Sequence, residues 1–291
     1  MVPQFTRQHR ILAALALSAA AFAWLYAHVF AKLAHDWATD GNYSHGFLIA
    51  PLTAYFVWQR LPDLQRLPLQ PSRLGALVVI ASLMCLVAGT LGAELFLTRI
   101  SIVGVLAGAV LFLGGWAHLR VVAFPLLFLL LMIPLPAIIF NQIVLPLQLI
   151  ASQLGATVLY AAGIPVLREG NVIVLARTSL EVAEACSGIR SLVSLLTLGI
   201  VLGYFTDQRA WVRTSLSLAT VPITILTNGL RVAGMGLVAH YYGTAAAEGF
   251  MHAFSGWLVF AVALAMLFGL QRALSAARPA FGAAVARSVW S

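Results

Sequence analysis

Charged residues are scarce in this chain. Only 9% of its 291 residues are Asp, Glu, Lys or Arg, whereas 62% are hydrophobic. Soluble globular domains contain about 25% charged residues and roughly 45–50% apolar residues, so this chain has too little polar surface for a water-soluble protein. Its two cysteines, Cys85 and Cys186, are too few for a disulfide framework. What remains is a polytopic helical membrane protein.

Several signatures of binding chemistry are also missing. The net charge is +8, but the 17 basic residues are spread over short segments, without the basic runs and interleaved aromatics of a nucleic-acid-binding surface. The sequence contains no CxxC, HExxH, Gly-rich phosphate loop or dinucleotide fingerprint. We therefore expect no nucleic-acid partner, no metal and no cofactor.

Long apolar runs fill most of the chain. A run of about 20 apolar residues can cross a bilayer, and alternating segments typical of an outer-membrane barrel are lacking. The sequence predicts an all-α polytopic membrane protein with about eight transmembrane helices in a single domain, 1–291. The expected spans are 11–30, 47–61, 74–92, 100–117, 120–140, 187–206, 213–240 and 253–272. The first has a longer apolar run than a signal peptide, so we expect it to stay uncleaved.

The charged residues predict how these spans are oriented. With the N-terminus in the cytoplasm, the cytoplasmic segments hold 11 basic and 2 acidic residues, and the opposite side holds 6 basic and 7 acidic residues. Such an asymmetry follows the positive-inside rule. We therefore expect both termini in the cytoplasm.

The region between the fifth and sixth spans is more polar. Residues 141–164 predict an amphipathic helix, interfacial or re-entrant on the outer side. The next stretch alternates apolar and polar residues around a turn-like Arg-Glu-Gly-Asn at 168–171. This pattern predicts a small extracytoplasmic β-hairpin before the sixth span.

Three residues with reactive or ionisable side chains fall at the outer ends of spans, where such residues are costly and mark functional sites. They are Cys186, Arg231 and His252. Their location at one membrane face is independent support for a functional site, because it was not used to predict the topology. Cys85 lies within an apolar run, where it is expected to be a small buried hydrophobe.

Cys186 has the features of a nucleophile. It lies in Glu-Ala-Cys-Ser-Gly-Ile-Arg, between Glu184 and Ser187, at a predicted helix N-terminus. The backbone N–H groups and the dipole at such a terminus favour the thiolate, and a histidine is its usual proton partner. An inert cysteine in a helix start is the alternative, and the arginine and histidine at the same face favour the functional interpretation.

Arg231 and His252 supply complementary chemistry. A guanidinium in a partly dry site can hold an oxyanion or a carboxylate, and Asn228 lies three residues earlier on the same helical face. The alternative for Arg231 is snorkelling towards lipid headgroups. A histidine suits general acid–base catalysis, and Glu248, four residues before His252, is placed to orient its ring.

His45 is a fourth candidate at the same face, in Asp-Gly-Asn-Tyr-Ser-His-Gly at 40–46. It could orient substrate or close the site. Alternatively, it belongs to a turn in which Ser44 or Asn42 caps the next helix. Met-Ile-Pro-Leu-Pro at 132–136 is expected to break the fifth span and to shape the wall of the site.

At these residues the sequence resembles the exosortase/archaeosortase family of integral-membrane cysteine transpeptidases. The resemblance rests on motifs in the family order: Asn-Tyr-Ser-His-Gly at 42–46, Pro-Leu-Pro at 134–136, Ala-Cys-Ser-Gly-Ile-Arg at 185–190, Asn-Gly-Leu-Arg at 228–231, and His252 before Ser255-Gly256. It implies that Cys186 is the nucleophile, Arg231 the transition-state stabiliser and His252 the acid/base.

The resemblance also implies the substrate and the location. The substrates would be exported proteins with a C-terminal sorting signal: a Pro-Glu-Pro motif, a transmembrane helix and a basic tail. The enzyme would lie among the lipids of a bacterial inner membrane, with its site on the periplasmic side, in an exopolysaccharide-associated role. Water, or an amine of a lipid or glycan, would resolve the acyl-enzyme.

Two other classes remain open on the sequence. In a transporter or polysaccharide-export component, Arg231 and His252 would line a solute path, although transporters place such residues near the bilayer midplane. A rhomboid-like serine protease using Ser255 is a weaker alternative, because the glycine expected two residues before the serine is missing.

Overall fold

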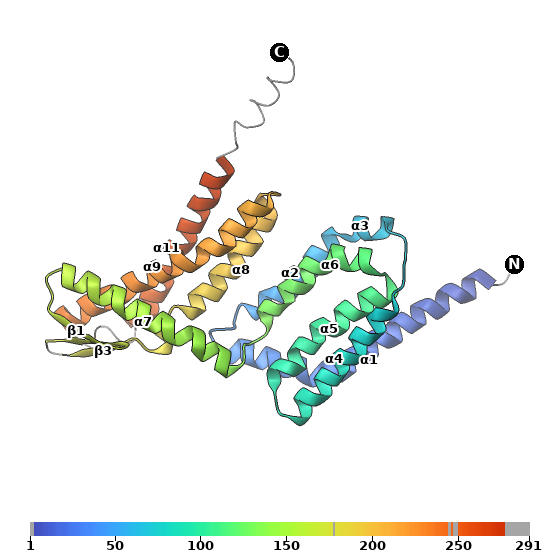
Figure 1. Ribbon diagram of the computed structural model, residues 1–291, viewed down its shortest axis with the longest axis horizontal. Helices are drawn as coiled ribbons and strands as arrows, with labels where there is room; N and C mark the ends of the chain where they lie inside the picture. Colours follow the sequence, from blue (N-terminus) through green and yellow to red (C-terminus); the bar gives the residue numbers. More distant parts are fainter. Residues whose placement is uncertain (1–2, 177, 244–245, 247–249, 277–291) are drawn as a thin grey trace, which may run out of the picture. The chain divides into compact units, whose positions relative to one another are not determined.

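Helices make up most of the computed structural model, which describes residues 3–176, 178–243, 246 and 250–276 (Figure 1). The chain divides into two compact units, residues 1–136 and 137–291. Within the described ranges, seven helices are long and apolar enough to cross a membrane, and residues 46–59 and 116–132 form shorter apolar helical segments. The protein is therefore an all-α polytopic membrane protein.

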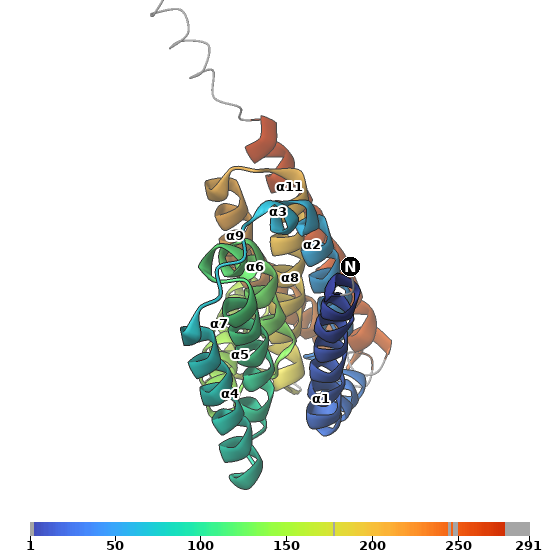
Figure 2. The same ribbon diagram turned by 90° about the vertical axis from the view of Figure 1, so that its right-hand side faces the viewer.

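The first unit consists of helices joined by short turns: α1 (Pro3–Thr39), α2 (Gly46–Gln59), α3 (Leu61–Arg66), α4 (Arg73–Leu91), α5 (Leu95–Leu113), α6 (Trp116–Phe128) and the 3₁₀ turn η1 (Leu129–Met132). Helices α4 and α5 form an antiparallel hairpin (Figures 1 and 2). Their backbones approach closely at Gly75, where an added Cβ would lie 2.2 Å from the backbone nitrogen of Phe112. Small residues thus permit tight helix packing, as is common in membranes.

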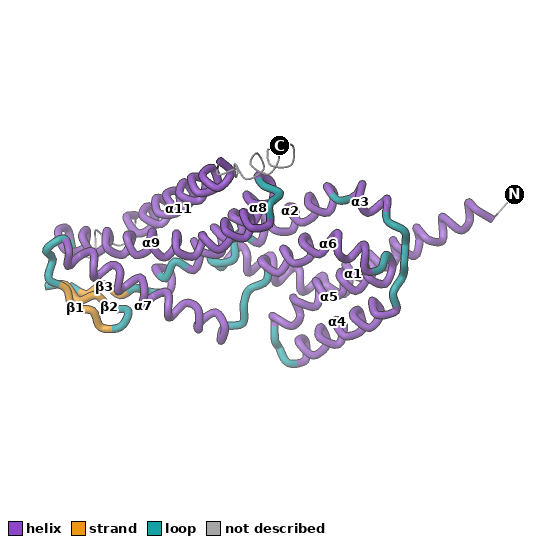
Figure 3. Tube along the Cα trace, turned by 45° about the horizontal axis from the view of Figure 1, so that its top comes forward, coloured by secondary structure: helices purple, strands orange, loops and turns teal. Residues whose placement is uncertain are grey.

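The second unit contains α7 (Ala137–Ala161), strands β1 (Val166–Glu169), β2 (Val172–Leu175) and β3 (Ser179–Glu181), the 3₁₀ turn η2 (Glu184–Cys186), and helices α8 (Ile189–Thr206), α9 (Ala210–Tyr242) and α11 (Phe250–Ala276). Helices α8, α9 and α11 pack against one another. The sheet lies at one end of this unit (Figure 3). Cys186 follows the sheet directly and precedes α8.

The fifth expected span is wrong as one continuous helix over 120–140. The helical segment ends at Met132, Ile133 is extended, and α7 begins at Ala137. The physical reason is the pair Pro134 and Pro136, which lack the backbone N–H needed to continue a helix. The sequence therefore located the break correctly but assigned residues 137–140 to the wrong helix.

The expected β-hairpin is a three-stranded antiparallel sheet in the order β1-β2-β3. Glu169 pairs with Val172 across the predicted turn, and Val172 also pairs with Glu181 on its other side. The prediction of two strands was wrong because the alternation continues through Ser179–Glu181, beyond a second turn. This third strand carries the chain to Cys186.

Helix α7 is a single helix of 25 residues and is long and apolar enough to span a bilayer. It crosses α9 obliquely in Figure 1. One of its faces is buried, whereas Asn141, Gln142, Gln153 and Thr157 are exposed. Large apolar side chains such as Ile138, Leu145 and Tyr160 are exposed as well, and the interfacial or re-entrant placement of 141–164 stays a prediction.

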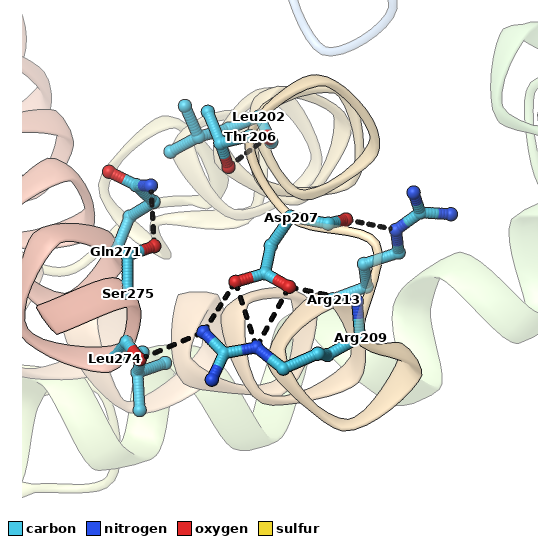
Figure 4. Close-up of polar contacts among 8 residues, drawn as sticks. All are labelled: Leu202, Thr206, Asp207, Arg209, Arg213, Gln271, Leu274 and Ser275. Atoms are coloured by element: carbon cyan, nitrogen blue, oxygen red, sulfur yellow. Dashed lines mark hydrogen bonds and ion pairs between the residues drawn. The ribbon is translucent and has the colours of Figure 1, made fainter. Parts of the chain in front are cut away.

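The α8–α9 turn is fixed by a polar cluster around Asp207 (Figure 4). Arg209 Nε donates to Asp207 Oδ1 at 3.0 Å, and Arg213 Nε donates to the Asp207 carbonyl at 2.6 Å. Hydrogen bonding from Arg209 lowers the pKa of Asp207 to about 2. Arg209 Nη2 also donates to the Leu274 carbonyl on α11 at 3.2 Å, so this turn ties three helices together.

Candidate active site

Cys186 lies at the end of the turn η2, between the sheet and α8. Its backbone N–H donates to the Ala183 carbonyl at 2.9 Å, which closes the turn. The buried Ser187 hydroxyl accepts from the N–H of Ile189 at 3.2 Å and so satisfies a donor in the first turn of α8. The thiol is half-buried against the apolar cluster of the second unit, while Glu184 is exposed.

Asn228 holds this segment from the neighbouring helix α9. Its side-chain Nδ2 donates to the Cys186 carbonyl at 2.7 Å, and only 3% of Asn228 is exposed. Gly188 lies against the same amide, because a Cβ there would be 3.0 Å from Asn228 Cγ. Gly188 also has φ +86°, a left-handed conformation that favours glycine. The Cys-Ser-Gly motif is thus shaped to receive Asn228.

Arg231 lies one turn further along α9 and reaches the adjacent carbonyl. Its Nη1 is 3.4 Å from the Ala185 carbonyl oxygen, and its Nε donates to Ser255 Oγ on α11 at 3.2 Å. Ser255 in turn donates to Met235 Sδ at 3.6 Å. The guanidinium is therefore oriented by contacts from two elements, η2 and α11, beside the cysteine.

Close packing of α7 on α9 supports this end of α9. An added Cβ at Gly155 would lie 2.5 Å from Val232 Cγ1, and one at Gly236 would lie 2.6 Å from Leu159 Cδ1. Gly236, which follows Arg231 in sequence, thus lies in a close helix-packing surface. Larger residues at these glycines would displace α9 and with it Arg231.

The pKa of the Cys186 thiol lies above its ordinary value. Burial raises this pKa because it disfavours the thiolate, and the positive charge of Arg231 opposes the rise. The sequence placed Cys186 at a helix N-terminus, whereas α8 begins at Ile189, and burial is the largest influence on the pKa of the thiol. Arg231 is the group that moves the thiol towards ionisation.

His252 and Glu248 complete the set of candidates in this unit. The backbone of His252 belongs to the first turn of α11, three residues before Ser255. The side chain of His252 lies outside the described part of the structure, and so does Glu248. In the described ranges, no group of three or more His, Cys, Asp or Glu side chains could hold a metal ion.

His45 lies in the first unit and contacts the Pro-Leu-Pro break. A carbonyl only accepts, so His45 Nε2 donates to the Leu131 carbonyl at 3.0 Å. Trp37 Nε1 donates to the Met132 carbonyl at 2.9 Å, and the Tyr43 hydroxyl accepts from the Leu135 N–H at 3.2 Å. These three side chains satisfy backbone groups where the helix ends.

The neighbouring glycine completes this arrangement. An added Cβ at Gly46 would lie 2.3 Å from Trp37 Nε1, so the indole requires glycine there. His45 itself occupies the N-cap position of α2 and makes no side-chain cap bond, and the Ser44 hydroxyl donates to the Gly41 carbonyl at 3.3 Å. Burial lowers the pKa of His45, and hydrogen bonds to the carbonyls of Leu131 and Asn42 partly oppose this.

Sequence reasoning missed two sets of contacts. Arg99, counted only as an outer charge, is 3% exposed on α5 and forms an ion pair with Asp36 on α1. Ser255 was considered only as an alternative nucleophile, whereas it orients Arg231. The sequence did indicate that Ser255 lies near the proposed site, because Ser255 is one helical turn after His252.

Comparison with known proteins gives one match. A family model described as transmembrane exosortase matches residues 37–269, a range that includes parts of both units and all the motifs above. No curated protein and no solved structure matches the chain.

Proposed function

The chain belongs to the transmembrane exosortase family, and from this premise we propose that it is a membrane-embedded cysteine transpeptidase acting on the C-terminal sorting signals of exported proteins. Family membership supports the general transpeptidase-type role. The observation that carries the proposed chemistry is that Asn228 and Arg231, one turn apart on α9, donate to the consecutive carbonyls of Cys186 and Ala185. A thiol and a cation thereby share one site.

The first half of the reaction forms a thioester. Cys186 Sγ transfers its proton to His252 and attacks the carbonyl carbon of the scissile peptide bond. The carbonyl oxygen becomes an oxyanion, and Arg231 stabilises it with its guanidinium. When the intermediate collapses, the C–N bond breaks and His252 returns the proton to the leaving amine. The membrane-anchored tail is released and the acyl group stays on Cys186.

The second half of the reaction restores the enzyme. An amine of a lipid or glycan, or water, attacks the thioester while His252 accepts its proton. The C–S bond then breaks and the proton returns to the Cys186 sulfur. Transfer to an amine attaches the exported protein to an acceptor, and transfer to water releases it.

The raised pKa of Cys186 fits a cysteine that ionises on substrate binding. In the resting site, burial keeps the thiol protonated. Removal of its proton by His252, with Arg231 near, would produce the thiolate only as attack begins. Such coupling limits side reactions of the half-buried thiol with oxidants.

We also propose that the site faces the periplasm of a bacterial inner membrane. Helix α8 has 18 residues, about 27 Å at 1.5 Å per residue, which is close to the thickness of a hydrocarbon core. Cys186 precedes it, and Arg209 and Arg213 follow it. Basic residues after α8 support a cytoplasmic α8–α9 turn and an outward-facing thiol.

Labelling of intact spheroplasts with a membrane-impermeant maleimide tests this orientation. Cys186 in a Cys85→Ala background should be labelled, whereas Cys85 in a Cys186→Ala background, within the candidate span Arg73–Leu91, should not be labelled. Labelling of Cys186 that depends on permeabilisation would contradict the proposed orientation.

Substitution of the nucleophile tests the activity. The probe is a tagged exported reporter that ends in a Pro-Glu-Pro segment, a transmembrane helix and a basic tail. Cys186→Ala and Cys186→Ser should abolish its cleavage while the enzyme still accumulates in membranes, and Cys85→Ala, the matched control, should cleave normally. Normal processing by Cys186→Ala would overturn the proposed function.

A further inference from the structure

The outer edge of β3 is open. The sheet order makes β3 an edge strand. The N–H of Val182 donates to the Asn171 carbonyl and that of Leu175 to the Thr178 carbonyl, so in this register Leu180 forms the intervening hydrogen-bonded pair with Ile173. The N–H and C=O groups of Ser179 and Glu181 therefore point away from β2. No described strand pairs with them there.

The same backbone leads directly to the cysteine. Beyond β3, both backbone groups of Val182 bond to Asn171. The Val182 N–H donates to the Asn171 carbonyl, and the Val182 carbonyl accepts from Asn171 Nδ2 at 3.3 Å. Ala183 remains extended, with φ −65° and ψ 171°, and the next three residues form the turn that ends at Cys186. The open edge and the thiol are thus consecutive parts of one segment.

The side chains of β3 leave this edge accessible. Leu180 points to the apolar cluster of the second unit, against which Cys186 also packs. Ser179 and Glu181 are exposed. An incoming extended peptide would therefore meet the outward N–H and C=O groups of Ser179 and Glu181. The packing of Leu180 on the apolar cluster holds this edge in place.

We propose that the outer edge of β3 is the substrate-binding edge, where an extended segment of the substrate next to its scissile bond adds as a fourth strand. Strand addition uses main-chain hydrogen bonds for affinity and tolerates varied side chains. It also fixes the register of the peptide, which positions one carbonyl carbon near the Cys186 sulfur. The inference rests on the proposed function and adds how the substrate is held.

The opposite edge of the sheet is unsuited to this task. Strand β1 is separated from β3 by β2, about 10 Å away at roughly 4.8 Å per strand. It packs against α7 and does not continue into the cysteine turn. Because β2 pairs with β1 through Val172 and Val174, the N–H of Arg168 points outward on that edge. Arg168 therefore offers a matched control position.

Proline substitution tests the edge. Glu181→Pro removes one outward N–H and keeps every β2–β3 hydrogen bond, and proline is tolerated at such edge positions. The KM for the sorting-signal reporter should rise about 3- to 10-fold, as for the loss of one hydrogen bond, with kcat less affected. Arg168→Pro, which alters the other edge, should retain the wild-type KM, and Glu181→Ala, which keeps the N–H, should raise KM less than Glu181→Pro does.

Alkylation of Cys186 by iodoacetamide distinguishes docking from folding, because this small reagent needs no strand addition. Its rate in Glu181→Pro should stay within about two-fold of wild type. A wild-type KM in Glu181→Pro would overturn the proposed binding edge. The proposed function would still stand if Cys186→Ala is inactive. Equal increases in KM for Arg168→Pro and Glu181→Pro would also overturn it.

A second measurement leaves the enzyme unchanged. Peptides from the cleaved segment of the reporter, each N-methylated at one backbone position, would compete with the reporter for wild-type enzyme. Because alternate residues of an added strand donate to the edge, inhibition should weaken at every second non-proline position. Uniform tolerance of N-methylation, or weakening without alternation, would overturn strand addition even if Glu181→Pro fails to fold.

Discussion

The side-chain amide of Asn228 donates a 2.7 Å hydrogen bond to the backbone carbonyl of Cys186, 42 residues earlier in the chain. This bond joins α9 to the turn that carries the thiol. The next turn of α9 presents Arg231 to the neighbouring carbonyl. The geometry of the site therefore depends on one helix face and one short turn.

Asn228→Ala should reduce reporter processing about 10- to 100-fold, because leaving a buried carbonyl without its donor costs about 1–3 kcal/mol. Reporter cleavage in membranes with matched enzyme levels measures the loss. Ser217→Ala on the same helix is the control, since the Ser217 hydroxyl donates to the Arg213 carbonyl of its own helix. Equal activity of the two variants would show that the Asn228 tether has no role in positioning Cys186.

Gly188→Ala should reduce processing at least 10-fold, because it combines left-handed strain of about 1–2 kcal/mol with a Cβ 3.0 Å from Asn228 Cγ. Gly170→Ala provides a matched control: Gly170 has φ +64°, and its added Cβ would meet nothing within 4 Å. Cleavage assays on both variants separate backbone strain from the clash. If Gly170→Ala loses as much activity, the contact with Asn228 is not the cause.

Arg231→Gln should slow alkylation of Cys186 at pH 8. The positive charge of Arg231 lowers the pKa of the thiol against the larger effect of burial, so removing it raises that pKa further and reduces the thiolate fraction. The rate of iodoacetamide alkylation, measured from pH 6 to 10, should rise at higher pH in this variant than in wild type. Arg213→Gln, at the α8–α9 turn, should leave the profile unchanged. A profile that does not move in Arg231→Gln would mean that the two groups do not interact.

The protein should lose thermal stability as the pH falls below about 6.5. Burial lowers the pKa of His45 from its ordinary 6.5, so the unfolded chain binds a proton in this range more readily than the folded protein. Melting curves in detergent at pH 7.5 and 5.5 should show the fall, and His45→Gln should diminish it. His28→Gln, at an exposed position of α1, should retain it. An unchanged pH dependence in His45→Gln would assign the effect to other groups.

Local patterns in the sequence were sufficient for the class, and they supplied the residues of the proposed site. Apolar runs predicted the membrane helices because each run must match the bilayer by itself, and alternation predicted strands after residue 164. Proline placed the break near residue 134. The cysteine, the arginine and the asparagine were chosen because of their chemistry. The third strand was missed because its alternation continued beyond a turn that was not recognised.

Which side chains contact one another depends on the tertiary structure. The Cys186 carbonyl meets Asn228, Arg231 meets Ser255, and His45 meets a backbone carbonyl 86 residues away. Likewise, burial raises the pKa of the Cys186 thiol. No sequence motif indicates how deeply a side chain is buried. Local sequence specified most of the helices, because helical hydrogen bonds join residues four apart. Contacts between helices and the desolvation of their side chains arise only when distant segments pack.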